Sequence, residues 1–153
     1  MPRHSETKHL PYTPEQLFAL VADVGRYDEF LPWVTAVRIK SDSQTEMVAD
    51  LIVGFNAFKE RFTSKVTKER PGHIHVEYVD GPLKYLKNEW RFDAVPDGGT
   101  DVYFSVDFAF KNRIFEALAG QMFDRALRRM TGAFEARAHE LYGSSKSSAQ
   151  SAA

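Results

Sequence analysis

The sequence predicts an α+β fold in which a curved antiparallel sheet of about seven strands surrounds one long C-terminal helix, with two short helices after the first strand. Apolar residues recur at steps of three and four between residues 112 and 142, which is the spacing of a helix face. Between residues 34 and 110 the period changes to two, and short turn signals separate the alternating segments. Successive strands with short turns favour an antiparallel meander, and only the long helix is large enough to cover its apolar face.

The N-terminal part predicts one strand and two short helices. Residues 5–10 are compatible with a short strand. Thr13 and Gln16 match a capping box, and Pro14 falls at the first helical position, where proline is tolerated. A second short helix is expected at residues 26–31.

Six further strands are expected from the alternation of apolar and polar residues. Turn signals follow several of them, the clearest being the Pro-Asp-Gly-Gly sequence at residues 96–99. The expected strands are residues 34–40, 47–55, 58–67, 74–78, 86–93 and 102–110.

The long helix is predicted to begin after Asn112, a suitable N-cap, and to end before Gly143. Its apolar stripe is expected to face the sheet and contains Phe115, Leu118, Met122, Ala126, Met130 and Phe134. The opposite side carries Arg125, Arg128, Arg129 and Arg137. These arginines are interpreted as a solvated face paired with Glu135 and Glu140; the alternative is a docking surface for anionic lipid headgroups or ribosomal RNA.

Composition narrows the function classes. The chain has 153 residues, enough for one domain, and we assign residues 1–143 to it; the low-complexity tail, residues 144–153, is expected to be disordered. The net charge of -1 argues against binding driven by bulk electrostatics, and nothing indicates DNA as a partner. The absence of cysteine excludes disulfides and thiolate chemistry. Because the first six residues lack an apolar signal core, we expect a cytoplasmic protein that meets a membrane only at its inner surface.

Several stretches, in this order and spacing, resemble the coenzyme Q-binding START-domain family, which includes the bacterial RatA proteins and belongs to the polyketide cyclase and START helix-grip superfamily. The resemblance covers residues 3–143, and the family usually has an aromatic residue where this chain has Leu83. The matching stretches are YDEFLPW (27–33), ADLIVGF (49–55), ERFTSKV (60–66), DGPL (80–83), NEWRF (88–92) and AFEARA (133–138).

The resemblance implies a non-enzymatic protein that binds a polyprenyl quinone, ubiquinone, in a hydrophobic tunnel and supports respiratory electron transport as its carrier or chaperone. It implies no cofactor other than this bound ligand, and a membrane surface as a transient partner. Two alternatives remain: a RatA-type toxin that inhibits translation by binding the large ribosomal subunit, and an enzyme similar to the related cyclases. The residues expected to line the tunnel are Trp33, Leu51, Val53, Phe62, Tyr78, Leu83, Asn88, Trp90, Phe104, Phe108, Phe115, Met122 and Met130.

Three features of the expected site remain open. Asn88 falls on the apolar face of its strand, where it serves either a structural network or a hydrogen bond to a quinone carbonyl, with Trp33 or Tyr78 assisting. The turns at residues 56–58 and 81–85 carry apolar residues that suggest the ligand entrance. His73 and His75 are interpreted as exposed strand residues rather than metal ligands, because no third ligand has suitable spacing.

Overall fold

The computed structural model describes residues 3–55 and 58–143, and it contains one seven-stranded antiparallel sheet in the order β1-β7-β6-β5-β4-β3-β2. The predicted fold class is confirmed. The expected tail at residues 144–153 lies outside the described residues. The elements are β1 (Arg3–Leu10), α1 (Pro14–Ala22), a 3-10 helix η1 (Val24–Glu29), β2 (Val34–Asp42), β3 (Glu46–Phe55), β4 (Phe58–Glu69), β5 (His73–Asp80), β6 (Leu83–Ala94), β7 (Thr100–Phe110), α2 (Arg113–Ala138) and a final π-helical turn η2 (His139–Gly143).

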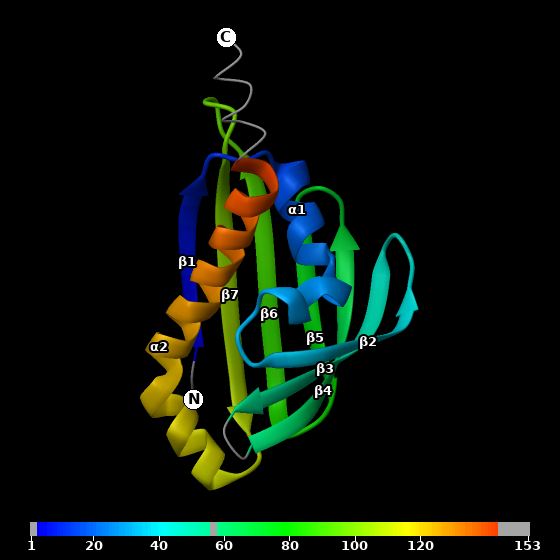
Figure 1. Cartoon of the computed structure of the whole chain (residues 1–153), viewed down its shortest axis with the longest axis vertical. Helices are drawn as coiled ribbons and strands as arrows, with labels where there is room; N and C mark the ends of the chain where they lie inside the picture. The colour runs from blue at the N-terminus through cyan, green and yellow to red at the C-terminus, as the bar shows by residue number, and fades with distance from the viewer. Residues whose placement is uncertain (1–2, 56–57, 144–153) are drawn as a thin grey trace.

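All the helices cover the same face of the sheet (Figure 1). Helix α2 runs diagonally along β7, α1 covers part of β5 and β6, and η1 packs against β2. The strands are paired by simple hairpin connections except that β1 joins the sheet beside β7, which places the first strand next to the last one. The covered face is the inner face of the sheet and contains the core.

The predicted helix caps are present. Thr13 Oγ1 accepts a hydrogen bond from the Gln16 N–H at 3.2 Å, and Gln16 Oε1 accepts one from the Thr13 N–H at 3.0 Å. Asn112 Oδ1 accepts hydrogen bonds from the backbone N–H groups of Ile114 and Phe115, at 2.8 and 3.1 Å. The second short helix differs from the expectation at residues 26–31: it is the 3-10 helix η1 and begins at Val24.

The apolar stripe of α2 is buried at only one end. Leu127 and Phe134 are 8% and 7% exposed, whereas Leu118 is 48% exposed, so the prediction that Leu118 faces the sheet is wrong. The reason is the four-residue spacing of the stripe. At 3.6 residues per turn each step of four residues advances about 40° around the helix, and from Leu118 to Phe134 the stripe turns through about 160°. The sheet therefore receives the C-terminal end of the stripe, and Leu118 faces outward.

Aromatic side chains fix α2 to the sheet and to η1. The Phe134 ring lies 5.1 Å from the Trp90 ring of β6, 5.5 Å from Tyr27 and 5.3 Å from Phe30, centroid to centroid. These edge-to-face contacts hold the C-terminal half of α2 over the centre of the sheet. They also form one end of an internal cavity.

Candidate functional site

An internal cavity of about 240 Å³ lies between the inner face of the sheet and the helices. Strands β3 to β7 form its floor, because alternate residues of each strand point inward. The helices and the segment before β2 form its roof. The lining residues are Val21, Val24, Tyr27, Leu31, Val34, Ala49, Leu51, Ser64, Val66, Ile74, Val76, Leu86, Asn88, Trp90, Phe104, Val106, Met130 and Phe134.

The cavity is apolar and contains no charged side chain, because no Asp, Glu, Lys, Arg or His is among its lining residues. Its volume is below the range of about 300–1,000 Å³ typical of pockets for drug-sized ligands. A ligand with a long chain must therefore extend past the cavity or widen it. Only Tyr27, Ser64, Asn88 and Trp90 bring polar side-chain atoms to the lining.

Asn88 is held by the protein itself. Its amide Nδ2 donates to the backbone oxygen of Ser105 at 2.8 Å, and its Oδ1 accepts a hydrogen bond from Trp90 Nε1 at 3.1 Å. The structural network that was one alternative for Asn88 is thus present. One N–H of the amide and one lone pair of Oδ1 remain for another partner.

Tyr27 is also committed to a protein contact. Its hydroxyl donates to the backbone oxygen of Val21. Burial, and to a smaller extent the negative charge of Asp23, raises the pKa of the Tyr27 hydroxyl well above its ordinary value. The side chain is neutral at physiological pH and poorly suited to proton transfer.

Five of the residues predicted to bind ligand lie together around the cavity, and the rest lie elsewhere. Phe108 and Phe115 belong to an adjacent aromatic cluster: Phe108 contacts Phe110 and Phe123, and Phe110 contacts Phe115, at centroid distances of 5.8–6.0 Å. Met122 is half-buried beside this cluster in α2. The five lining residues are Leu51, Asn88, Trp90, Phe104 and Met130.

The remaining predicted residues surround the cavity without lining it. Val53 and Phe62 are half-buried neighbours of Leu51 on β3 and β4. The Tyr78 hydroxyl accepts a hydrogen bond from the Leu83 N–H at 3.0 Å. Leu83 is 3% exposed, which contradicts the expectation of an exposed apolar tip at residues 81–85. The other candidate entrance includes residues 56–57, which lie outside the described residues.

Trp33 lies beside the roof of the cavity rather than in its lining. Its neighbours Leu31 and Val34 line the cavity, and the guanidinium of Arg129 sits 5.3 Å from the centre of its ring. Trp33 has φ = 71°, a left-handed conformation that non-glycine residues rarely adopt. The contact between Trp33 and Arg129 joins the segment before β2 to α2, next to the cavity-lining Met130.

Sequence reasoning missed the lining residues contributed by α1 and η1, including Val21, Val24 and Tyr27. Their pattern is that of an ordinary amphipathic helix face, which does not reveal whether the face packs tightly or borders a space. Ser64 was also missed. Its position between Phe62 and Val66 in the strand alternation was the signal that places it on the inner face.

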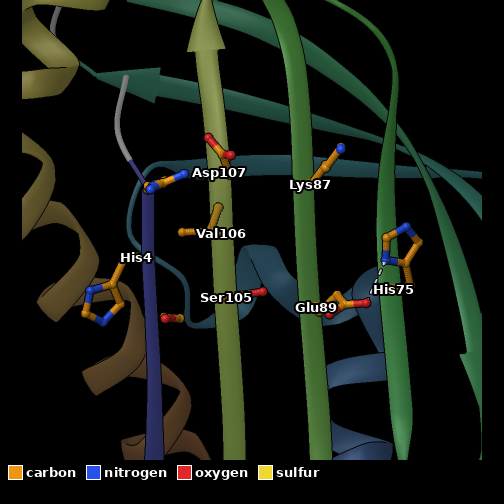
Figure 2. Close-up of a pocket in the computed structure, with 9 residues that line it drawn as sticks. His4, His75, Lys87, Glu89, Ser105, Val106 and Asp107 are labelled. Atoms are coloured by element: carbon orange, nitrogen blue, oxygen red, sulfur yellow. Dashed lines mark ion pairs between the residues drawn. The ribbon is translucent and has the colours of Figure 1, made fainter.

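The outer face of the sheet has a shallow hollow of about 590 Å³ over β1, β7, β6 and β5 (Figure 2). Figure 2 shows His75 and Glu89 pointing toward one another, and His75 Nδ1 lies 3.6 Å from Glu89 Oε1. His73 Nε2 lies 3.5 Å from the same carboxylate oxygen. Within residues 3–55 and 58–143 no group of three or more His, Cys, Asp or Glu side chains is arranged to hold a metal ion. Basic Lys87 and acidic Asp107 also line the hollow, which gives it mixed charge.

One face of α2 is exposed and has a distinctive composition. Ile114 is 69% exposed and Leu118 48%, and by helical geometry Arg125 and Arg128 lie within about 40° of Ile114 around the helix axis. These four residues are called the exposed helix face below. The first turns of α2 (yellow in Figure 1) lie at the opposite end of the molecule from α1.

The expected pairing of the α2 arginines with Glu135 and Glu140 is largely wrong. Glu135 pairs with Lys8 at 2.6 Å, and Glu140 pairs with Arg137 at 3.2 Å. Neither Arg125 nor Arg128 forms an ion pair with any residue in the part of the chain that the structure describes. The exposed helix face therefore combines two apolar side chains with two uncompensated positive charges. None of the helices in the described ranges is long and apolar enough to cross a membrane.

Comparisons with known proteins agree with this geometry. Residues 10–135 match the family described as polyketide cyclase / dehydrase and lipid transport. The ribosome association toxin RatA of Rickettsia prowazekii is 36% identical over 140 residues, which cover 88% of this chain and 94% of that protein. The mitochondrial coenzyme Q-binding protein COQ10 homolog B of Xenopus laevis is 33% identical over 144 residues, covering 92% of this chain and 59% of that protein.

Two solved structures share the fold. An 18 kDa protein from Caulobacter crescentus is 40% identical, has a TM-score of 0.73, and is matched over 94% of this chain and 99% of its own. A START superfamily protein from Mycobacterium smegmatis has a TM-score of 0.77 at 15% identity, over 91% of this chain and 98% of its own. The latter likeness shows the helix-grip fold alone.

Proposed function

Because this chain belongs to the polyketide cyclase / dehydrase and lipid transport family, we propose that it is a non-enzymatic protein that binds a polyprenyl quinone, ubiquinone, in the cavity under α2. In this proposal it carries or presents the quinone for respiratory electron transport, in the cytoplasm and at the inner face of the membrane. The single observation that carries the proposal is an apolar cavity with no charged lining residue. Such a cavity stabilises an isoprenoid chain through burial, at about 25 cal/mol per Å² of apolar area, without directional contacts.

The lining residues support binding rather than catalysis. General acid–base catalysis needs a group that exchanges protons near neutral pH, and nucleophilic catalysis needs an activated nucleophile beside a base. The only lining residue with a resolved pKa shift is Tyr27, and that shift keeps its hydroxyl protonated. The name of the COQ10 homolog B relative, a coenzyme Q-binding protein, also supports a binding role.

Filling the cavity tests this proposal. Leu51 faces the cavity, and Ile52 is its neighbour on the opposite face of β3. Leu51→Trp should occupy the space and abolish binding of a short-chain ubiquinone to delipidated protein, measured by calorimetry. Ile52→Trp adds the same side chain outside the cavity and should bind like the parent. Equal quinone binding by both variants would place the ligand elsewhere.

We further propose that the exposed helix face docks on an anionic bilayer, from which the quinone is taken or to which it is delivered. Ile114 and Leu118 supply the apolar contact, and Arg125 and Arg128 supply positive charge for lipid phosphates. Leu118→Asp should reduce co-sedimentation with vesicles that contain phosphatidylglycerol. The matched control is Ala136→Asp, which adds the same charge at an exposed position near the other end of α2. Equal loss in both variants would indicate a general charge effect and refute this docking face.

Association with the ribosome is the second candidate function. The relative from Rickettsia prowazekii is named a ribosome association toxin, and unpaired Arg125 and Arg128 suit a phosphate-rich partner such as ribosomal RNA. Replacing both arginines by glutamine should then abolish salt-sensitive co-sedimentation with the large ribosomal subunit. Leu51→Trp should leave that co-sedimentation intact. If neither the parent nor any variant sediments with the subunit, the second candidate fails.

A further inference from the structure

Four polar or charged residues of the described chain are buried, and their hydrogen bonds differ. Thr63 Oγ1 donates to Asp50 Oδ1 at 2.5 Å, and Thr100 Oγ1 donates to the backbone oxygen of Tyr12 at 2.7 Å. Ser64, which is 4% exposed, is the fourth. Its hydroxyl forms no hydrogen bond with any residue in the described ranges 3–55 and 58–143.

Most of the polar side chains that line the cavity are likewise hydrogen-bonded within the protein. Of its polar lining groups, the Tyr27 hydroxyl is bonded to Val21, and the Trp90 indole is bonded to Asn88, which itself donates to Ser105. Ser64 is the remaining one. Among the described residues, the enclosed side-chain atoms without a hydrogen-bond partner are His4 Nε2 and His75 Nδ1. The Ser64 hydroxyl is therefore not sealed in the core but borders the cavity, where another molecule can satisfy it. The space beside Ser64 is the cavity itself.

Sheet register places Ser64 two strands away from Asn88 and two residues along the sheet from it, because Ser64 pairs with Tyr78 whereas Val66 pairs with Val76. Ser64 lies on β4 and Asn88 on β6, and both border the cavity across the intervening strand β5, where Val76 pairs with Asn88. Strands are spaced about 4.8 Å apart and each residue advances about 3.4 Å, so the backbones of Ser64 and Asn88 are about 12 Å apart. A ring that lies over β5 between Ser64 and Asn88 can therefore contact both side chains.

We propose that Ser64 is the hydrogen-bond donor for the oxygen of an uncharged ligand headgroup, with the second Asn88 N–H on the other side of that headgroup. A hydroxyl can donate to a carbonyl oxygen, and a quinone ring offers carbonyl acceptors at opposite positions. The absence of a charged lining residue disfavours an ionised carboxylate or phosphate here, since such a group would be buried without a countercharge. The inference rests on the proposed quinone function and adds to it the residue that selects a carbonyl headgroup.

Ser64→Ala tests this assignment, because it removes the hydroxyl and leaves the strand and the cavity intact. Delipidated Ser64→Ala protein should bind a short-chain ubiquinone about 2- to 12-fold more weakly than the parent, the effect of one neutral hydrogen bond. Binding of a prenyl hydrocarbon that lacks the ring should not weaken. The melting temperature without ligand should stay the same or rise, whereas a structural role for the hydroxyl predicts a decrease.

Two further measurements make the result specific. Infrared spectra of isotope-labelled ubiquinone should show a carbonyl band lowered in frequency in the parent and in Ser64→Thr, which keeps a hydroxyl, but not in Ser64→Ala. Ser105→Ala is the matched control on the outer face of β7, and it should bind like the parent. Equal binding and an identical carbonyl band in the parent and Ser64→Ala would overturn the role of Ser64 and leave quinone binding standing. Failure of the parent to bind any ubiquinone would overturn the proposed function and this inference with it.

Discussion

Replacing Phe134 by alanine should lower the free energy of unfolding much more than truncating an exposed side chain in the N-terminal half of α2. The Phe134 ring is 7% exposed and contacts the rings of Trp90, Phe30 and Tyr27 at 5.1–5.5 Å. Phe→Ala substitutions in cores cost about 3–5 kcal/mol of unfolding free energy. Because Phe134 borders a cavity, its side chain makes fewer contacts than one at a fully packed site, and fewer are lost on its removal. We therefore expect the free energy of unfolding to fall by about 3 kcal/mol, the lower end of that range.

Urea unfolding of the delipidated protein, followed by far-UV circular dichroism, measures this loss. For a chain of this size about 3 kcal/mol corresponds to a decrease of about 6–12 °C in melting temperature. Leu118→Ala is the control, since its side chain is 48% exposed on the same helix. It should change the unfolding free energy by no more than about 0.5 kcal/mol. A cost below about 1 kcal/mol for Phe134→Ala, or similar costs for both variants, would refute the conclusion that α2 is held by its C-terminal half.

Three smaller predictions follow from individual contacts. Asn112→Ala should lower the unfolding free energy by about 1 kcal/mol through loss of the α2 N-cap, while Asn112→Asp keeps an acceptor oxygen and should cost little; equal losses would contradict a capping role. The raised pKa of Tyr27 means that the unfolded chain releases this proton near pH 10 while the folded chain retains it. The free energy of unfolding should therefore fall above about pH 10, by up to about 1.4 kcal/mol per pH unit, and Tyr27→Phe should lack that part of the slope; identical slopes in urea titrations would contradict the assignment. A double-mutant cycle of Trp33→Ala and Arg129→Gln should give a coupling energy of about 0.5–1 kcal/mol, and additive effects would show that their stacking contributes nothing.

The features that the sequence predicts well depend on neighbours in the chain. The capping box at Thr13 and the N-cap at Asn112 are hydrogen bonds between residues at most three positions apart. The alternation of residues within the expected strand 86–93 was likewise enough to assign Asn88 and Trp90 to the inner face. Local patterns of this kind need no knowledge of what packs against them.

The features that sequence reasoning missed depend on how elements meet. The stripe of α2 turns through about 160° between Leu118 and Phe134, and the crossing of the helix over the sheet decides that the Phe134 end is buried and Leu118 exposed. Leu83 resembles an exposed turn residue but packs at 3% exposure at the start of β6. Leu31 and Val34 reach the cavity through the left-handed backbone at Trp33, which no pattern in the sequence indicates.

The most direct test of the central claim is mass spectrometry of the organic extract from protein purified out of its own host. The account predicts ubiquinone at close to one molecule per chain in the parent and a strong depletion in Leu51→Trp, in which the cavity is filled. An extract without quinone, or with the same amount of quinone in the parent and Leu51→Trp, would contradict binding in the cavity under α2.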